Sequence, residues 1–198
     1  MIAEIHVHGH PHKFGLDKAD TFCKIAKQKG IDCLIFTEHA HTLSNGFWTD
    51  KNIKILSENN DIIIMTGQEV STDIGDILLY GYPQLIQKKM LFKDLQSSEQ
   101  WAIVSAHPAR RGKINRLNPW MHKIDAIEVM NKSYCIEDCK QSLDFAKNYD
   151  CGIVGSSDVH LNRHVGICPC YVPECKDIFD FVSYIKLKQV VPLNIRAF

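Results

Sequence analysis

The chain has 198 residues, enough to bury a substantial core, and we expect residues 1–198 to form a single domain. Apolar residues make up 45% and charged residues 23%, which is ordinary usage for a folded protein. The 23 lysines and arginines balance the 23 aspartates and glutamates, so no basic surplus favours nucleic acid or an anionic membrane as the main partner.

Short aliphatic or β-branched runs alternate with longer amphipathic segments along the chain. The runs predict seven strands, over Ile2–Val7, Cys33–Thr37, Ile62–Thr66, Ile77–Tyr82, Ala102–Ala106, Ala126–Met130 and Ile153–Ser156. Apolar residues at helical spacing predict four helices, over Asp17–Lys29, Asp50–Asn59, Tyr134–Tyr149 and Asp177–Leu187. The connection between Thr66 and Ile77 is too short for a crossover helix, so we expect a hairpin or bulge there.

This alternation predicts an α/β fold, with a parallel sheet closed or nearly closed into a small barrel by crossover helices. Eight complete units usually need about 250 residues, so seven strands with some short or missing helices fit this length. In such a barrel the residues at the C-terminal ends of the strands converge on one mouth. We therefore expect functional side chains at those ends.

Eight cysteines are scattered along the chain, several inside apolar stretches such as Asp32–Phe36. This pattern is typical of buried thiols, and no signal peptide precedes the first strand, so we expect reduced cysteines and a cytoplasmic protein. A thiolate metal site at Cys168, Cys170 and Cys175 is the alternative, although these residues lack the paired spacing of structural zinc sites. No apolar stretch approaches the length of a membrane span.

Residue types that bind metal ions follow most of the predicted strands. His6 and His8 end the first strand, and two imidazoles two residues apart on a strand point to the same side and can share one ion. Four later runs continue the pattern: Thr37-Glu38-His39, Gly67-Gln68-Glu69, Ala106-His107-Pro108 and Ser157-Asp158-Val159-His160. Any one of these residues alone is more often a buried histidine, a helix cap or an ion-pair partner. Together at one mouth they predict a multinuclear metal site, since imidazole and carboxylate suit zinc, manganese and iron.

These motifs, in this order, resemble those of the polymerase-and-histidinol-phosphatase (PHP) superfamily, and the resemblance spans His6 to Gly166. It implies a distorted (β/α)7 TIM-like barrel, the PHP fold, that hydrolyses phosphoesters with two or three divalent metal ions, variously zinc, manganese or iron. It also implies three ligand sets: His6, His8, Glu69 and Asp158 for one ion, Glu69 and His107 for a second, and His39 and His160 for a third. In that scheme we assign catalytic roles to Asp158, His160 and Glu69.

The chain departs from the family pattern at two places. After the first motif the family carries a further His or Asp, and here the candidates are His10, His12 and Asp17, of which we favour His12. Near the fourth strand the family supplies a histidine, where this chain has Asp76 before the strand and Tyr80-Gly81-Tyr82-Pro83 at its end. Asp76 would replace that histidine as an oxygen ligand; otherwise the second ion position is short of a ligand.

Phosphoester hydrolysis needs a nucleophile at neutral pH and neutralisation of charge on the phosphoryl oxygens. Our hypothesis is attack by a hydroxide bridging two ions, with a protonated His or Asp near the leaving oxygen as general acid. Arg110 and Arg111 follow His107 and are the candidates for binding the phosphate, with Arg163 a weaker one; a solvated basic loop is the alternative. Glu128, inside a predicted strand, is expected behind the site and not as a ligand.

The leading hypothesis is a phosphomonoesterase acting on a small-molecule phosphate ester, and the balanced charge disfavours nucleic acid. The enzymatic alternatives are a phosphodiesterase or nuclease and a protein-tyrosine phosphatase. The alternative from another class is a catalytically degenerate metal-binding domain that regulates a partner. The loops His41–Asp50 and Arg110–Trp120 are expected either to set substrate choice or to cover the barrel.

Overall fold

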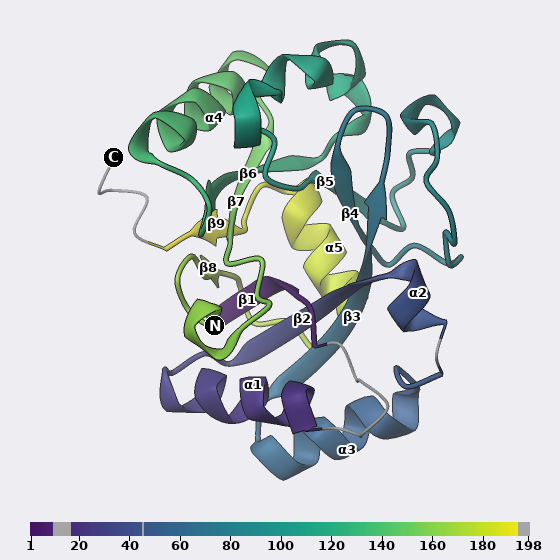
Figure 1. Cartoon of the computed structure of the whole chain (residues 1–198), viewed down its shortest axis with the longest axis vertical. Coiled ribbons are helices and arrows are strands. Elements are labelled where there is room, and N and C mark those ends of the chain that lie inside the picture. The colour runs from purple at the N-terminus through teal and green to yellow at the C-terminus, as the bar shows by residue number, and fades with distance from the viewer. Residues whose placement is uncertain (10–16, 45, 194–198) are drawn as a thin grey trace.

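A computed structural model of the chain describes residues 1–9, 17–44 and 46–193. Within these residues the strands form one mixed sheet in the order β7-β6-β5-β4-β3-β2-β1-β8-β9 (Figure 1). The strands are β1 (Ile2–Val7), β2 (Cys33–His39), β3 (Ile63–Ser71), β4 (Asp76–Tyr80), β5 (Ala102–Ser105), β6 (Ala126–Asn131), β7 (Gly152–Ser156), β8 (Cys170–Tyr171) and β9 (Val191–Pro192).

The helices lie around this sheet, with α1 and α3 side by side at one end of the molecule and α4 at the other (Figure 1). The α-helices are α1 (Asp17–Gln28), α2 (Ala40–Leu43), α3 (Asp50–Asn60), α4 (Ile136–Asn148) and α5 (Ile178–Lys186), and the 3₁₀ helices are η1 (Phe92–Asp94), η2 (Arg110–Gly112), η3 (Ile114–Lys123) and η4 (Asn162–His164). None of these helices is both long and apolar enough to cross a membrane.

All seven predicted strands and all four predicted helices are present, but the expectation of a parallel sheet is wrong for part of it. Strand β4 runs antiparallel to both β3 and β5, because the connection from β3 is a tight turn with no room for a crossover helix. The predicted hairpin between Thr66 and Ile77 is thereby confirmed. The short strands β8 and β9 are also antiparallel, and their two residues each are too few for a periodic pattern.

The predicted end of the third strand is also wrong. Strand β3 continues past Thr66 to Ser71, so Glu69 lies inside the strand and not beyond it. A Cβ at Gly67 would lie 2.8 Å from the backbone oxygen of Leu79, so glycine is needed here for close approach of the two hairpin arms.

The sheet closes into a distorted barrel where the end of β1 meets the segment after β7. The backbone N–H of His8 donates to the carbonyl of Val159 at 2.8 Å, and the N–H of Val159 donates to the carbonyl of His6 at 3.0 Å. Strands β7 and β9 are also in contact. The predicted TIM-like α/β barrel is confirmed, and its closure joins two of the segments that carry candidate ligands.

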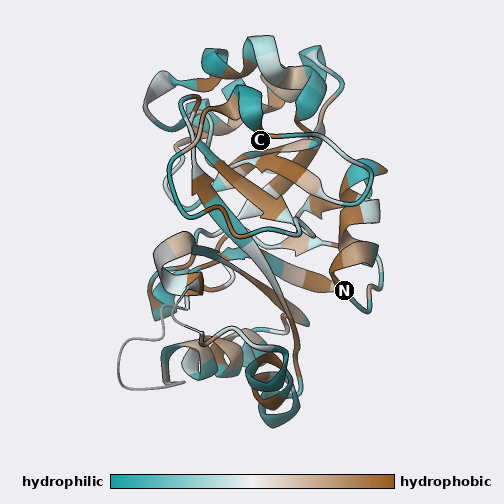
Figure 2. Ribbon diagram, turned by 90° about the vertical axis from the view of Figure 1, so that its right-hand side faces the viewer, coloured by the Kyte–Doolittle hydropathy of each residue, from teal (hydrophilic) through white to brown (hydrophobic). Residues whose placement is uncertain are grey.

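The core lies along the strands, where apolar residues concentrate at the middle of the molecule (Figure 2). Helix α5 packs on β4 and β5 and adds Phe181, Val182 and Ile185 to a buried cluster that includes Ile5 of β1. Tyr80 belongs to the same cluster, and its hydroxyl donates to the Ile5 carbonyl at 2.8 Å. This packing fixes the strands whose other ends carry the site.

Candidate metal centre

His6 and His8 lie at the end of β1 with their imidazoles fully buried and facing each other. The two Nε2 atoms are 3.0 Å apart. Side chains two residues apart on a strand point to the same side, which explains the shared direction. Two ring nitrogens at this distance repel unless a proton or a metal ion lies between their lone pairs.

Glu69 is the carboxylate that most of the histidines share. Its Oε2 lies 3.5 Å from Nε2 of His6, 3.1 Å from Nε2 of His8 and 3.3 Å from Nε2 of His39. Its Oε1 lies 3.5 Å from Nε2 of His107. The parallel register of β2 and β3 sets His39 opposite Glu69. Because both oxygens face imidazoles, this side chain is placed as a bridging ligand would be.

The Glu69 carboxyl is ionised despite its burial. Burial alone would raise its pKa, but the charge of His6 and hydrogen bonds from His107, His6 and His8 hold the pKa well below the usual range. Conversely, burial would lower the pKa of His6, and the carboxylates of Glu69 and Glu128 outweigh it, so that pKa lies well above the usual value. The groups form one charge-coupled cluster.

Asp158 follows β7 and faces the same point as His6 and His8. Its Oδ1 lies 3.6 Å from Nε2 of His6, 3.5 Å from Nε2 of His8 and 3.1 Å from Nδ1 of His160. Burial raises its pKa, but the hydrogen bond from His160 and the charges of His6 and Lys132 dominate, so the pKa is strongly lowered. The side chain is therefore an anionic oxygen donor.

Two residues of this cluster have a strained backbone conformation. Asp158 and His107 have φ values of 44° and 34°, in the left-handed region that favours glycine. Such conformations cost about 1–3 kcal/mol each and persist only where the surroundings enforce them. Both residues carry side chains that point at Glu69 or the His6–His8 pair.

Asp76 joins the cluster because β4 runs antiparallel to its neighbours. The register pairs Ser71 with Asp76 and Ile77 with Ser105, so the first residue of β4, and not its last, lies at the mouth. Ser71 Oγ donates to Asp76 Oδ1 at 2.8 Å. Tyr80, at the other end of the strand, is buried in the core. Of the two places considered for the missing histidine, the mouth therefore holds Asp76.

Three groups of donor atoms among the described residues are compact enough to hold an ion, with the atoms of each group within 4.8 Å of one another. They are His6, His8 and Asp158; His8, His39 and Glu69; and Glu69, Asp76 and His107. Nitrogen and oxygen donors in this mixture suit zinc, manganese or iron. The donor set therefore fits divalent metal ions, and shared residues link the three groups into one centre.

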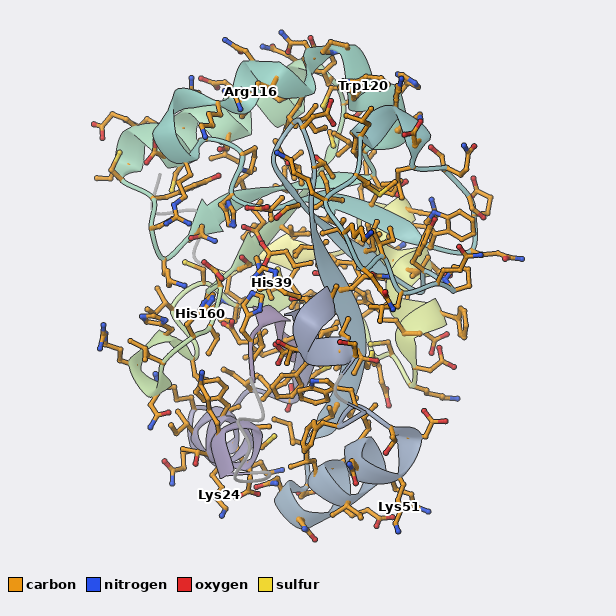
Figure 3. All side chains as sticks on the ribbon, turned by 45° about the vertical axis from the view of Figure 1, so that its right-hand side comes forward. Lys24, His39, Lys51, Arg116, Trp120 and His160 are labelled. Atoms are coloured by element: carbon orange, nitrogen blue, oxygen red, sulfur yellow. The ribbon has the colours of Figure 1, made fainter. Side chains whose placement is uncertain are left out.

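His39 and His160 form the outer rim of this centre. Their side chains are 35% and 40% exposed, and Figure 3 shows both at the middle of the molecule, where the strand ends meet. The ring of His160 lies 4.4 Å from that of His8, and its backbone N–H donates to Nδ1 of His164 at 3.2 Å. His160 belongs to none of the three compact groups, in the described part of the chain. Its predicted role as a ligand remains a prediction.

Glu128 lies behind the centre, as expected from the sequence. Its Oε1 is 2.8 Å from Nδ1 of His6 and accepts from Ser156 Oγ at 2.5 Å. Its Oε2 accepts from the backbone N–H of His107 at 2.8 Å and from Asn131 Nδ2 at 3.0 Å. With Nδ1 engaged by a carboxylate, His6 presents Nε2 to the cluster, which is the usual support for a metal-binding histidine.

Several predicted residues lie elsewhere or outside the described residues. His10 and His12 fall in the range 10–16, and the side chains of Asp17 and Arg111 are likewise outside the described part. Arg110 lines a cavity of about 190 Å³ together with Asp76, His107 and Lys113. Arg163 is exposed in η4.

The loops expected either to set substrate choice or to cover the barrel lie in different places. Arg110 and Lys113 line the cavity beside His107. Arg116 and Trp120 lie at one end of the molecule, away from His39 and His160 (Figure 3). The ring of Trp48 packs on Phe36, with centroids 4.4 Å apart, and so covers the barrel.

Sequence reasoning missed three lysines at the site. Lys132 Nζ contacts the carbonyl oxygen of Asp158 and lies 2.9 Å from its Oδ2. Lys88 and Lys89 line a cavity of about 270 Å³ that also touches His39 and Glu69. Lys132 directly follows strand β6, so its position at a strand end was the available signal.

Comparison with known proteins supports the fold. No protein-family model matches the chain, and no curated protein matches its sequence. Among solved structures, one similar protein is a two-domain protein from Bacteroides vulgatus that contains a predicted PHP-like metal-dependent phosphoesterase. The match has a TM-score of 0.68 and 12% sequence identity, and it covers 97% of this chain and 64% of that chain. PsfC from Pseudomonas syringae matches with a TM-score of 0.66 and 16% sequence identity, covering 97% of this chain and 90% of that chain. An amidohydrolase from Chromobacterium violaceum, solved with bound sulfate and no metal, matches with a TM-score of 0.60 and 16% sequence identity. The match covers 92% of this chain and 96% of that chain.

Proposed function

We propose that this chain, which has the fold of PHP-like metal-dependent phosphoesterases, is a metal-dependent hydrolase of small phosphate monoesters. The observation that carries the proposal is the sharing of Glu69 by four imidazoles, with Asp158 and Asp76 completing groups of donors on either side. Buried charges are costly unless they are paired or coordinate a metal ion, and this cluster offers donor atoms for an ion in three groups.

The chain's own residues divide into ligands and supports. In this proposal His6, His8 and Asp158 hold one ion, Glu69, Asp76 and His107 a second, and His8, His39 and Glu69 offer a third position. Such ions, when bound, would lower the pKa of a bound water towards about 7 and would neutralise charge on a phosphoryl group. Glu128 holds the His6 ring in the orientation that this arrangement needs.

Cationic side chains beside the centre support an anionic substrate. Arg110 and Lys113 line the cavity next to Asp76 and His107, and Lys88 and Lys89 line the cavity next to His39 and Glu69. Arginine binds phosphate oxygens bidentately, so we assign Arg110 to the phosphate. The cations favour a phosphoester over an uncharged amide.

We assign His160 as the general acid that donates a proton to the leaving oxygen. This side chain is the most exposed of the cluster histidines, so it can reach a substrate that enters from solvent. Its Nδ1 lies near both Asp158 Oδ1 and the Asp158 carbonyl, at 3.1 and 3.0 Å, which orients the other ring nitrogen away from Asp158. A positioned histidine of this kind contributes typically about 10²–10⁴-fold to such a step.

The size of the cavities favours a small substrate. At about 190 and 270 Å³ they are below the range of about 300–1,000 Å³ typical of pockets for drug-sized ligands. A phosphodiesterase or nuclease, a protein-tyrosine phosphatase and a catalytically degenerate metal-binding domain are the alternatives that the test below distinguishes.

A cytoplasmic location is part of the proposal. All eight cysteines are free, and six of them are buried. Burial raises the pKa of Cys23 to about 12, which is typical of an unreactive thiol in the core. Free buried thiols are common in reducing compartments.

The test is metal analysis of the purified protein followed by hydrolysis assays with added Mn²⁺. We expect bound transition metal and release of phosphate from 4-nitrophenyl phosphate in preference to bis(4-nitrophenyl) phosphate and a phosphotyrosine peptide. His8→Ala should lower activity by more than about 100-fold, since loss of even an outer partner of a metal ligand costs about 10–100-fold.

His122→Ala is the matched control, because His122 is exposed at the end of η3. It should leave metal content and activity unchanged. Protein without transition metal, together with an unaffected His8→Ala variant, would overturn the proposal. Bound metal without hydrolysis of any ester would instead favour the regulatory alternative, and preference for the diester would favour the diesterase.

A further inference from the structure

We propose that Lys132 is a built-in competitor of the metal ion at Asp158 and thereby sets a low affinity at the position formed by His6, His8 and Asp158. This inference rests on the proposed metal centre and concerns a residue outside its ligand sets. The competition arises because one carboxylate is shared between a fixed ammonium group and an ion.

The two oxygens of Asp158 face different partners. Oδ1 points at Nε2 of His6 and of His8, at 3.6 and 3.5 Å, and also lies 3.1 Å from Nδ1 of His160, so it is the oxygen that faces the donor group. Oδ2 lies 2.9 Å from Nζ of Lys132, which also contacts the Asp158 carbonyl oxygen and lies 3.5 Å from Nδ1 of His160. The carboxylate is therefore divided between two cation positions.

The backbone next to both partners is held in place. Lys132 follows Asn131, whose side chain donates to Glu128 Oε2 and to Ser156 Oγ and accepts from the backbone N–H of Ser133. Asp158 is held in a left-handed backbone conformation next to Val159, which pairs with β1. The Lys132 side chain thus extends from a fixed stretch of backbone and reaches Asp158 from there.

Charge determines the direction of the effect. The Lys132 side chain is 17% exposed and that of Asp158 is 8% exposed, so solvent and salt screen their interaction weakly. A divalent ion at Oδ1 would meet the positive charge of Lys132 across the same carboxylate. Removal of that charge while the carboxylate remains should strengthen ion binding.

Lys132 also affects how readily an ion leaves this position. Asp158 keeps a cationic partner whether or not an ion is bound, so the site retains charge compensation during metal exchange. An ion at this position should therefore exchange more readily than at a site built from the same ligands without a lysine.

The experiment compares Mn²⁺ affinity in the full chain by isothermal titration calorimetry for wild type, Lys132→Met and Lys132→Arg. Lys132→Met removes the charge and keeps most of the side-chain volume. We expect it to bind Mn²⁺ about tenfold more tightly, equivalent to about 1.4 kcal/mol. Lys132→Arg keeps the charge and should stay close to wild type.

Lys186→Met is the matched control. Lys186 Nζ also lies 2.9 Å from an aspartate oxygen, that of Asp125, and its side chain is 16% exposed, but the pair is remote from the donor groups. This variant loses an ion pair of the same length and similar burial, so it should leave Mn²⁺ affinity unchanged. A general effect of losing a Lys–Asp pair would appear in both variants.

The outcomes separate this inference from the proposed function. If wild type binds no Mn²⁺, the proposed centre fails and the inference fails with it. If wild type binds Mn²⁺ and Lys132→Met binds equally or more weakly, only the role of Lys132 is overturned. Lys132→Gln, which keeps a donor on a neutral side chain, is the second variant should Lys132→Met not fold, and the same increase in affinity is expected.

Discussion

Asp76 shows how one residue's function depends on the direction of its strand. From the sequence it was one of two places where an expected histidine was missing. The antiparallel run of β4 puts its first residue beside Ala106, whose backbone N–H donates to the Asp76 carbonyl at 3.0 Å. The Asp76 carboxylate thereby joins Glu69 and His107 in a compact donor group.

Asp76→Asn should weaken ion binding at this group, because the amide has lost the negative charge that attracts the cation. We expect affinity there to fall about tenfold or more, while binding at His6, His8 and Asp158 persists. Titration with Mn²⁺, together with the number of ions bound per chain, measures the change.

Asp73→Asn is the control for that substitution, since Asp73 lies in the same β3–β4 turn. Its Oδ1 accepts from the backbone N–H of Phe92 at 2.7 Å, a bond that asparagine can keep. Unchanged stoichiometry and affinity in Asp76→Asn would show that Asp76 is not a ligand.

Among the elements, α5 holds the strands that form the site. It begins with a capped turn, in which Asp177 accepts from the backbone N–H groups of Phe179 and Asp180 at 2.8 and 3.0 Å. Phe181 then packs against Tyr80, with ring centroids 4.9 Å apart. The helix therefore buttresses β4, the strand that delivers Asp76.

Phe181→Ala should lower the free energy of unfolding by about 3–5 kcal/mol, because a fully buried aromatic ring leaves a cavity in the core. Phe179→Ala, two residues earlier on the same helix, removes a ring that is 60% exposed and should change stability by less than about 0.5 kcal/mol. Urea unfolding followed by circular dichroism measures both. Equal losses would mean that α5 does not pack as described.

Across the whole molecule, the opposed charges of the cluster couple stability, metal binding and pH. The pKa of His6 lies well above its usual value of about 6.5, and those of His8 and His107 are also raised, because neighbouring carboxylates outweigh the effect of burial. The pKa values of Glu69 and Asp158 are lowered. Protons and metal ions therefore compete for the same nitrogens.

In chelator, the raised histidine pKa values contribute stability that is fully present below about pH 6.5 and is lost as pH rises through the higher folded-state values. The lowered carboxyl pKa values contribute stability that is fully present above the unfolded-state pKa of about 4. They therefore change the stability only below about pH 4. We therefore expect the Mn²⁺-induced rise in Tm to grow from pH 6 to pH 8. Thermal melts at matched ionic strength, with and without Mn²⁺, measure this difference. A Tm shift that is constant or falls with pH would contradict it.

Much of the site could be predicted from the sequence because its signals are local. A His-x-His pair on a strand points to one side whatever the fold around it, and apolar runs that end in His, Asp or Glu locate strand ends. His6, His8, Glu69, His107 and Asp158 were all named in this way, and the structure brings them together. Their roles as ligands await the metal analysis.

What the sequence alone determined was therefore seven of the nine strands, the barrel class and most of the donor types, because two-residue and 3.6-residue periodicities are properties of short segments. The tertiary structure decided the rest. Only the antiparallel pairing of β4 brings Asp76 to the mouth, and only the approach of β6 to the segment after β7 sets Lys132 on Asp158. The short connection after β3 predicted a hairpin, but the pairing of β4 with β5 and of β6 with β7 joins segments that are distant in the chain. No local pattern encodes the register of such pairs.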